Sequence, residues 1–486
     1  MNTITNENDA ISETGEKVIA VDFGADPRPK YAVLDSAIRA AIAQGALAVG
    51  ARLPPIRDLA YRIGVTPGTV ARVYRDLTEA GVLDAAVGRG TFVAAPAPPA
   101  PIYQEYQALA VDSTPHLTGG DSYAVNLLSP HLPSVGQSEL IRHLLAEVAQ
   151  DPPSGVMHYP VHSSERPARE AACTFLENEW LGPLEPDDIA LTHGGQQAIA
   201  LVLQCVLRGR RPVVLLEELA YPGFRRMAEM LRAEVQTVPI DDQGIVPDAL
   251  EQILRKSDIQ VLCTSPDVQN PTCAFMPEAR RRQIAEIARA ADIQILEDDC
   301  YMMEKAKLPT YRLLAPERTW HVSSIAKTIT PALRVGFALA PTGRRVALQR
   351  AAEYNSFGMA TPIADLTAKL LVHPDLPALM AGTRDMVCRY TQSAARILDG
   401  YDLRWRQDVS FMWLNLPGGW RASAFCRAAE AAGIKIRAAE EYAARDANAP
   451  HAVRFAVNAG VSLASFEAAM ERMRNLLDSP PEGLGV

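Results

Sequence analysis

The first hundred residues place apolar positions at helical spacing. Apolar residues recur every three or four positions in three segments, residues 31–47, 56–64 and 69–83. This period is typical of helices that bury one face. The last two segments are separated by Gly-Val-Thr at residues 64–66, the short glycine-containing turn of a helix-turn-helix unit. Residues 87–95, VGRGTFVAA, then predict a hairpin. The pattern predicts a mainly α winged helix-turn-helix domain over residues 29–94, the head.

A proline-rich stretch follows the head. Residues 94–101 read AAPAPPAP, and proline lacks a backbone N–H donor and favours extended conformations. Hydrophobic periodicity resumes near residue 125, so we expect a linker over residues 95–124. Residues 1–28 begin with a polar, partly acidic stretch without the basic and hydrophobic regions of a secretory signal. We therefore expect a disordered tail there.

The remaining chain alternates β-rich apolar segments with amphipathic helical ones. VVLLEE is followed by GFRRMAEML, and IQVLCTS is followed by PEARRRQIAEIARAA. This alternation predicts parallel strands joined by crossover helices, and hence an α/β fold for residues 125–480, the body. From about residue 354, helices mix with strands such as FMWLNL and AVRFAVN. We expect a smaller α+β lobe in this C-terminal part.

The composition is that of a multidomain globular protein. The 486 residues exceed one ordinary domain, and 48% of them are hydrophobic and 22% charged. No apolar run approaches the ~18 residues that a membrane span needs, so we expect a cytoplasmic protein without a membrane partner. The seven cysteines form no CxxC pair and no zinc spacing, which predicts reduced thiols and no structural metal.

The net charge of −9 is unevenly distributed. The head carries eight Lys and Arg residues against five Asp and Glu residues, a net charge of +3, so the rest of the chain carries −12. A small basic module on a large acidic chain indicates that the head binds DNA.

Five residues of the head are candidates for contacting DNA. A recognition helix presents short polar and cationic groups at its N-terminal end, where Thr66, Thr69 and Arg72 lie. Arg57, at the start of the preceding helix, can hold a phosphate, and Arg89 in the wing can reach a minor groove or a phosphate. Each arginine alone reads equally well as a solvated surface charge, but their grouping in one basic module favours the DNA interpretation.

The head resembles the DNA-binding domain of the GntR family of regulators. The segment LPPIRDLAYRIGVTPGTVARVYRDLTEAGVLDAAVGRGTFV matches it over nearly its full length. One departure is Pro67, where the family often has arginine. Proline suits the first position of a helix, but it removes one possible contact to DNA.

A lysine of the body and three short motifs elsewhere in its sequence are candidates for one site. Lys327 lies in SSIAKTITPALRVGF, where a lone lysine would more often be a surface residue. THGGQQAI joins a strand to a helix, a turn that can hold an anion. LEDDC offers a carboxylate for a pyridine nitrogen. QNPT offers an asparagine amide for a phenolate oxygen, although an ordinary turn fits it equally well.

Together these motifs resemble a fold-type I aminotransferase over roughly residues 125–478, and the resemblance implies pyridoxal 5′-phosphate (PLP) as cofactor. It makes Lys327 the internal-aldimine lysine, and the Asp-x-x-Tyr spacing makes Asp298 the partner of the pyridine nitrogen. Asn270 and Tyr301 would meet the phenolic oxygen of PLP, and Tyr221 would stack on its ring.

The resemblance also implies contacts to the phosphate and to a substrate. The phosphate would be held by Gly195, Gln196, Ser324 and Arg334. Arg454 would pair with a carboxylate through its bidentate fork. Tyr159 would reach the phosphate of a neighbouring subunit, which implies a homodimer with the heads swapped between bodies.

A GntR-like head joined to such a body resembles the MocR subfamily of bacterial transcription regulators. This resemblance implies a PLP-dependent regulator that binds operator DNA and senses an amine or amino-acid effector by forming an external aldimine. GABA-like compounds, diamino acids, ectoine-derived compounds, taurine and PLP itself are all open as effectors. So are the operator sequence and whether the protein activates or represses.

Two other functions remain open at this point. The chain can be an active aminotransferase that carries a DNA-binding head, because the lysine that holds PLP is also the base that transamination needs. It can also be a DNA-binding protein whose body has lost the cofactor. The basic head favours the regulator, since a metabolic transaminase has no use for it.

Overall fold

The chain divides into two compact units between Ala110 and Val111. The computed structural model describes Val21, Phe23 and residues 29–79, 82–86, 90–94, 125–155, 157–301, 303–444 and 449–480. The expected linker, most of the expected tail and Arg89 lie outside the described residues. In the part of the chain that is described, no helix combines the length and apolar character that crossing a bilayer requires.

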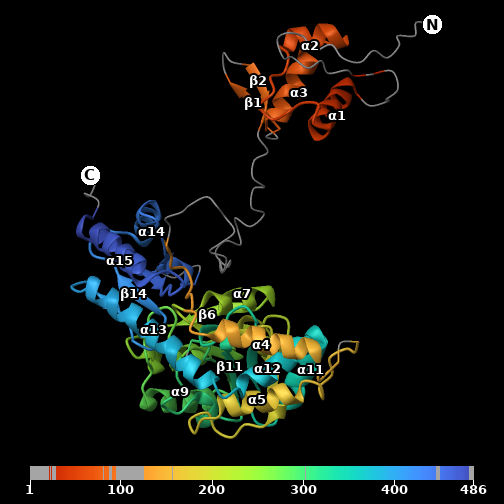
Figure 1. Cartoon of the computed structure of the whole chain (residues 1–486). Coiled ribbons are helices and arrows are strands. Elements are labelled where there is room, and N and C mark those ends of the chain that lie inside the picture. The colour runs from red at the N-terminus through yellow and green to blue at the C-terminus, as the bar shows by residue number, and fades with distance from the viewer. Residues whose placement is uncertain are drawn as a thin grey trace. The chain divides into compact units, whose positions relative to one another are not determined.

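The head contains three helices followed by a β-hairpin, which confirms the winged helix-turn-helix (Figure 1). Its elements are α1 (Lys30–Ala43), α2 (Ile56–Ile63), α3 (Pro67–Glu79), β1 (Leu83–Ala86) and β2 (Gly90–Val93). The core is formed by buried side chains at helical spacing, including Leu34, Ile38, Val70, Val73 and Leu77. Val21 and Phe23, within the segment expected to be a tail, pack against this core.

The conformation of the turn between α2 and α3 is explained by its residues 64–66 and by the proline that follows them. Gly64 ends α2 in the left-handed region with φ 67°, which glycine adopts without steric cost. The Thr66 hydroxyl accepts a hydrogen bond from the Thr69 N–H at 3.3 Å and so caps α3. Pro67 is the first residue of α3, where the missing N–H leaves no helical bond unmade.

The body is built on a seven-stranded sheet with the order β4-β12-β11-β10-β9-β5-β6. These strands are β4 (Ile189–Thr192), β5 (Val213–Glu217), β6 (Glu234–Val238), β9 (Val261–Thr264), β10 (Gln294–Asp298), β11 (Thr319–Ser324) and β12 (Gly336–Leu339). Most neighbours are parallel, as the sequence predicts. β12 is the exception, because it runs antiparallel to both β11 and β4. The short turn after Lys327 returns the chain directly, without the crossover helix that a parallel strand needs.

Helices cover both faces of this sheet (Figure 1). One face packs against α6 (Gly195–Val206), α7 (Pro222–Met230) and α11 (Arg345–Ser356). The other packs against α4 (Gln137–Gln150), α5 (Arg166–Leu176), α8 (Pro247–Leu254), α9 (Glu278–Ala290), α10 (Tyr311–Leu314) and α12 (Thr361–Leu371). Short elements connect them: η1 (Pro186–Asp188), η2 (Ile325–Lys327), β7 (Ile240–Asp241) and β8 (Gly244–Ile245).

A smaller lobe follows, with a four-stranded sheet in the order β13-β14-β17-β16. Its elements are α13 (Leu376–Ile397), β13 (Leu403–Arg404), β14 (Phe411–Asn415), α14 (Ala422–Ala431), β15 (Ile434–Lys435), β16 (Arg437–Ala438), η3 (Ala439–Glu441), β17 (Ala452–Ala456) and α15 (Leu463–Asp478). It begins later than residue 354, since α11 and α12 pack on the large sheet. The start of the body joins it, because β3 (Val125–Asn126) pairs with β15.

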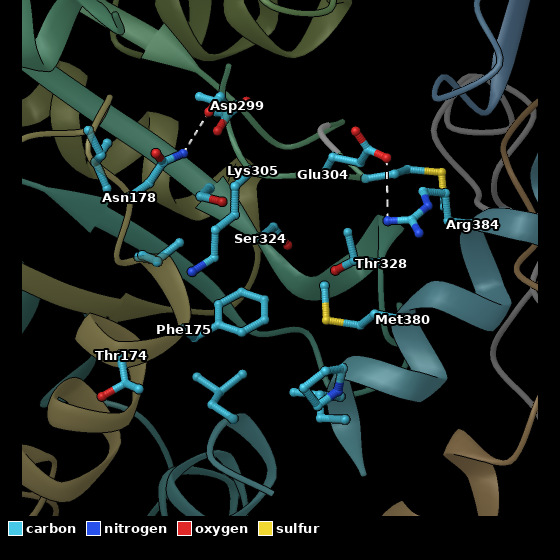
Figure 2. A pocket seen from close by; sticks show the side chains of 18 of the residues that line it. Thr174, Phe175, Asn178, Asp299, Glu304, Lys305, Ser324, Thr328, Met380 and Arg384 are labelled. Carbon is cyan, nitrogen blue, oxygen red and sulfur yellow. Dashed lines mark hydrogen bonds and ion pairs between the residues drawn. The ribbon is translucent and has the colours of Figure 1, made fainter. Parts of the chain in front are cut away.

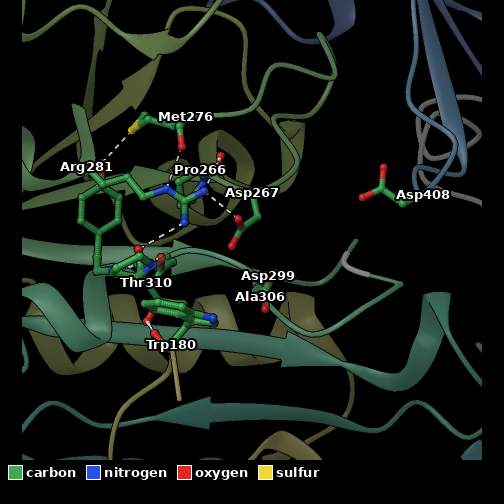
Figure 3. A network of polar contacts seen from close by, with 12 residues as sticks. Trp180, Pro266, Asp267, Met276, Arg281, Asp299, Ala306, Thr310 and Asp408 are labelled. Atoms are coloured by element: carbon green, nitrogen blue, oxygen red, sulfur yellow. Dashed lines mark hydrogen bonds and ion pairs between the residues drawn. The ribbon is translucent and has the colours of Figure 1, made fainter. Parts of the chain in front are cut away.

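A buried ion pair holds two loops of the body together (Figure 3). The guanidinium of Arg281 donates to Asp267 Oδ1 at 2.6 Å, and both side chains are almost fully buried. The same guanidinium donates to the carbonyls of Met276 at 2.8 Å and Pro309 at 3.3 Å. The loop that contains Asn270 is thereby tied to the loop that follows Tyr301.

We expect Arg281→Met to lower the free energy of unfolding by about 3–5 kcal/mol, because it leaves the Asp267 carboxylate buried without its cation. Arg282→Met, on the exposed face of α9, removes only a solvated pair with Glu278. This variant is expected to change the free energy of unfolding by less than about 0.5 kcal/mol. Urea unfolding of the full chain measures both. Equal shifts in the two variants would contradict a structural role for the Arg281 pair.

Candidate functional site

The predicted site residues of the large sheet lie at one edge. Asp298 ends β10, Asn270 follows β9, Tyr221 follows β5, and the Lys327 turn follows β11. The carboxyl ends of parallel strands meet at the same edge, and ligands of open α/β sheets bind there. The sheet topology therefore brings together residues that are far apart in sequence.

Lys327 ends a short 3-10 turn that Ser324 holds in place. The Ser324 hydroxyl donates to the Val335 carbonyl at 2.9 Å and accepts from the Ala326 N–H at 3.2 Å. The half-buried Lys327 Nζ lies 5.3 Å from the centre of the Tyr301 ring. Since the Ser324 hydroxyl proton is used by Val335, a hydrogen bond from Ser324 to a phosphate requires that hydroxyl to rotate.

Tyr301 lies between two cations. Arg454 Nη2 is 3.4 Å from the Tyr301 hydroxyl oxygen, and Lys327 lies over the ring. Burial raises the pKa of the Tyr301 phenol, but the charges of Lys327 and Arg454 outweigh burial and lower that pKa below its ordinary value. The two cations thereby favour the ionised form of the Tyr301 phenol.

The two adjacent carboxyls Asp298 and Asp299 have different neighbours. Asp298 Oδ1 accepts from the Cys300 N–H at 3.0 Å, and the Asp298 charge acts on Tyr221 and Tyr301. Asp299 instead lies 3.7 Å from the His321 ring. Burial raises the pKa of Asp298, against the opposing effect of its Cys300 bonds, so a cationic partner would stabilise its charged form. The role of Asp298 as partner of a pyridine nitrogen stays a prediction.

Glycines form a tight turn at the start of α6. Gly194 has φ 88° and precedes the first residue of the helix, Gly195. A Cβ on Gly336 would lie 2.6 Å from the Gly194 carbonyl carbon, and a Cβ on Gly194 would lie 2.6 Å from Arg334 Nη2. The backbone N–H groups of the helix start and the exposed guanidinium of Arg334 therefore lie close together, an arrangement suited to an anion.

Tyr221, Gln196 and Asn270 complete this edge. The Tyr221 hydroxyl donates to Gln196 Oε1 at 2.8 Å, and burial raises the pKa of the Tyr221 phenol. The Asn270 side chain is buried, and its Oδ1 has no hydrogen-bond partner among the described residues. An unsatisfied buried amide oxygen is costly without a partner, which is a feature of sites that hold a ligand.

These residues fit PLP. The site offers an amine at Lys327, a carboxyl at Asp298 for a pyridine nitrogen, and an anion cradle formed by Gly194, Gly195 and Arg334. Among the residues at this edge, Asn270 Oδ1, Asp299 Oδ1 and Arg454 Nε are buried without a hydrogen-bond partner in the described part of the chain. The donor set therefore matches the phosphate, ring and carbonyl groups of that cofactor.

Tyr159 lies at the surface of the chain, away from these residues. Its side chain is 83% exposed, and its ring centre lies 6.2 Å from that of Phe357, which is also exposed. Met157, Val161 and Tyr354 are exposed as well. Together these five residues form what we term the Tyr159 patch.

A separate cavity of about 720 Å³ lies beside the Lys327 turn (Figure 2). It shares Ser324 and Thr328 with that turn, and its other walls include Phe175, Lys305 and Asp299. Neither Lys327 nor Arg454 is among its lining residues. The cavity is therefore distinct from the residues gathered around Tyr301.

In the head, three of the predicted DNA contacts make local interactions. The Arg72 guanidinium lies 4.0 Å from the centre of the Tyr31 ring and 3.6 Å from the Asp76 carboxylate. Thr66 and Thr69 take part in the cap of α3, with their hydroxyls 3.0 Å apart. Arg57 is exposed at the start of α2.

The sequence analysis missed three neighbours of Tyr301. Cys300 lies against the glycine turn, since a Cβ on Gly195 would be 2.5 Å from its sulfur. The Arg437 charge acts on the Tyr301 phenol, and the Tyr442 side chain interacts with the Arg454 guanidinium. Arg437 and Tyr442 lie in IKIRAAEEYA, which has no recognisable motif, so the sequence contained no signal for their roles.

Comparisons with known proteins agree with this architecture. Residues 137–473 match the family of aminotransferases of class I and II. Residues 30–93 match the bacterial regulatory proteins of the gntR family.

Two regulators and one solved structure illustrate the likeness. The uncharacterized HTH-type transcriptional regulator YdeF of Bacillus subtilis is 27% identical over 93% of this chain and 95% of its own length. The HTH-type pyridoxine biosynthesis transcriptional regulator PdxR of Corynebacterium glutamicum is 30% identical over 64% of this chain and 65% of its own. The structure of LysN, an alpha-aminoadipate aminotransferase of Thermus thermophilus, covers 73% of this chain and 92% of its own, with a TM-score of 0.65 and 22% identity.

We expect Lys327→Ala to raise the pKa of the Tyr301 phenol, because the Lys327 charge helps to lower it while burial acts in the opposite direction. A pH titration of phenolate absorbance in the cofactor-free protein measures this change, and Tyr301→Phe identifies the signal. An unchanged titration in Lys327→Ala would show that the two groups do not interact.

Proposed function

The chain belongs to the class I and II aminotransferase family and carries a gntR-type DNA-binding head, and we propose its function from this premise. It is a PLP-dependent transcription regulator. Its head binds operator DNA, and its body senses a small molecule that contains a primary amine. Lys327 holds the cofactor, and Arg454 pairs with an acidic group of the effector.

The observation that carries this proposal is the contact of Tyr301 with both Lys327 and Arg454. PLP, when bound, supplies an electrophilic carbonyl carbon with which primary amines react. Lys327 would hold the cofactor through its Nζ amine, which is the group that an effector amine would compete with. The Tyr301 ring, whose centre lies 5.3 Å from Lys327 Nζ, would lie beside that amine. An effector that also engages Arg454 would then stabilise one arrangement of the body over another.

We propose a homodimer on the basis of the Tyr159 patch. Monomeric proteins rarely expose so many neighbouring large apolar side chains, and such groups mark interaction surfaces. A second copy of this chain is the partner that a symmetric oligomer would place there. The swap of heads between bodies stays a prediction from the resemblance.

The alternative function is an active aminotransferase with a DNA-binding head. Lys327 and Asp298 retain the groups that such chemistry uses. Incubating the PLP form with an amino donor and a keto acid distinguishes the two functions. Rapid multiple turnover would favour the enzyme, whereas a spectral change without turnover, accompanied by altered operator binding, supports the regulator.

We expect Lys327→Ala to lose the visible imine absorbance of the PLP form, because the variant lacks the amine that forms the bond. It should also lose the change in operator affinity that an amine produces in the wild type. Lys435→Ala removes an exposed lysine of the small lobe and is expected to keep both properties. If the absorbance persisted in Lys327→Ala, another residue would hold the cofactor.

We expect Arg57→Ala to weaken DNA binding about equally for specific and unrelated sequences, and to reduce the salt slope of binding by about one, as loss of one phosphate contact does. Arg39→Ala, in α1, removes an exposed arginine that already pairs with Asp35 and is the control. Fluorescence anisotropy at several salt concentrations measures both slopes. Identical slopes in wild type and Arg57→Ala would remove Arg57 from the interface.

A further inference from the structure

Two arginines oppose each other in the small lobe. β16 pairs antiparallel with β17, and Arg437 is directly opposite Arg454 in this register. Like charges at directly opposed positions of a sheet destabilise it. This arrangement therefore needs a source of negative charge to stabilise it.

One backbone carbonyl brings the two guanidiniums together. Arg437 Nε donates to the Leu128 oxygen at 3.1 Å, and Arg454 Nη1 donates to the same oxygen at 3.2 Å. The two donor nitrogens are therefore at most 6.3 Å apart, the sum of these distances. A carbonyl carries no formal charge, so it positions the guanidiniums without neutralising them.

The negative charge around this pair is incomplete. Glu441 pairs with Arg437, whereas no carboxylate among the described residues lies within ion-pair distance of Arg454. Arg454 is 2% exposed, and its buried Nε has no hydrogen-bond partner in the described part of the chain. Of the two cations, Arg437 alone has a carboxylate partner among the described residues.

The charges of both arginines reach the residues around Lys327. Arg454 contacts the Tyr301 hydroxyl, and the Arg437 charge also acts on the phenols of Tyr301 and Tyr442. The Arg437 side chain is 11% exposed, so it is largely withdrawn from solvent. Arg437 is therefore a largely buried charge that acts on the same phenol, Tyr301, as Lys327 does.

We propose that Arg437 and Arg454 form a double acid-binding site, and that the effector is an amino acid with two carboxylates. This inference rests on the proposed function, because it assigns the acidic groups of the same amine effector. Arg454 alone is sufficient for one carboxylate. Arg437 provides the second charge, and the two donor nitrogens, at most 6.3 Å apart, are within reach of carboxylates joined by two or three carbon atoms.

Glu441 forms the ion pair with Arg437 until such an effector binds. Its side chain is 31% exposed and belongs to the short turn η3, so it can turn towards solvent when a ligand carboxylate takes its place. Charge-assisted bonds between arginine and a carboxylate are among the strong hydrogen bonds of proteins. The exchange of one carboxylate for another keeps Arg437 paired.

The test compares acids with their amides on the full-length PLP form. L-aspartate and L-glutamate are titrated beside L-asparagine and L-glutamine, and the imine absorbance gives each apparent Kd. We expect the wild type to bind at least one acid about tenfold or more tightly than its amide, as a hydrogen-bonded charge provides. Arg437→Gln should remove that preference and leave the affinity for the amide within about twofold.

Two further variants make the test specific. Lys435→Gln removes an equal charge from an exposed position two residues away and should keep the preference for acids. Glu441→Gln should tighten binding of the acid, because it removes the carboxylate that competes for Arg437. A purely structural role for Arg437 would not produce this gain, so the Glu441 variant tests the proposal even if Arg437→Gln folds poorly.

The outcomes separate the two proposals. If acids and amides bind equally well to the wild type, or if Arg437→Gln weakens both to the same extent, the double acid-binding site is wrong and amine sensing stands. If none of the four amino acids changes the absorbance, while the methyl ester of each acid does, the preference for two carboxylates is likewise overturned. If no amine of any kind produces a change, the proposed function itself fails.

Discussion

The position of Tyr301 between Lys327 and Arg454 is the contact on which the site depends. The Tyr301 side chain is partly buried, and burial opposes ionisation, yet the two cations lower the pKa of its phenol. The same contact gives the Arg454 guanidinium one of its few polar partners in the described part of the chain. The site therefore contains positive charge that the surrounding side chains satisfy only in part, which is the condition that favours an anionic ligand.

This contact crosses the boundary between the large sheet and the small lobe. Lys327 and Tyr301 follow strands of the large sheet, whereas Arg454 lies on β17 of the small lobe. An apolar cluster joins the two parts through Val268 and Phe411, with Tyr301 packed against it. A ligand that contacts Lys327 and Arg454 at the same time would therefore favour one position of the small lobe relative to the large sheet. Domain closure couples ligand binding to conformation in this way.

The supporting structure explains why these groups stay in place. The buried pair of Arg281 and Asp267 ties the Asn270 loop to the loop after Tyr301. Arg406 adds a bond from the small lobe to the backbone of Asp267. The residues that would touch a ligand are thus held by a second layer of ion pairs and carbonyls, which limits the reorganisation that binding costs.

The sequence by itself determined the two-part organisation, since helical periodicity in the head and β/α alternation in the body follow from which residues must be buried. Its motifs also predicted roles for Lys327 and Asp298, because both occur in short segments with characteristic spacing. Only the tertiary structure decided that β12 runs antiparallel, that β3 joins the small lobe, and that Arg437 lies opposite Arg454. These features depend on which strands become neighbours and on how they pair, and neither leaves a periodic signal in the chain.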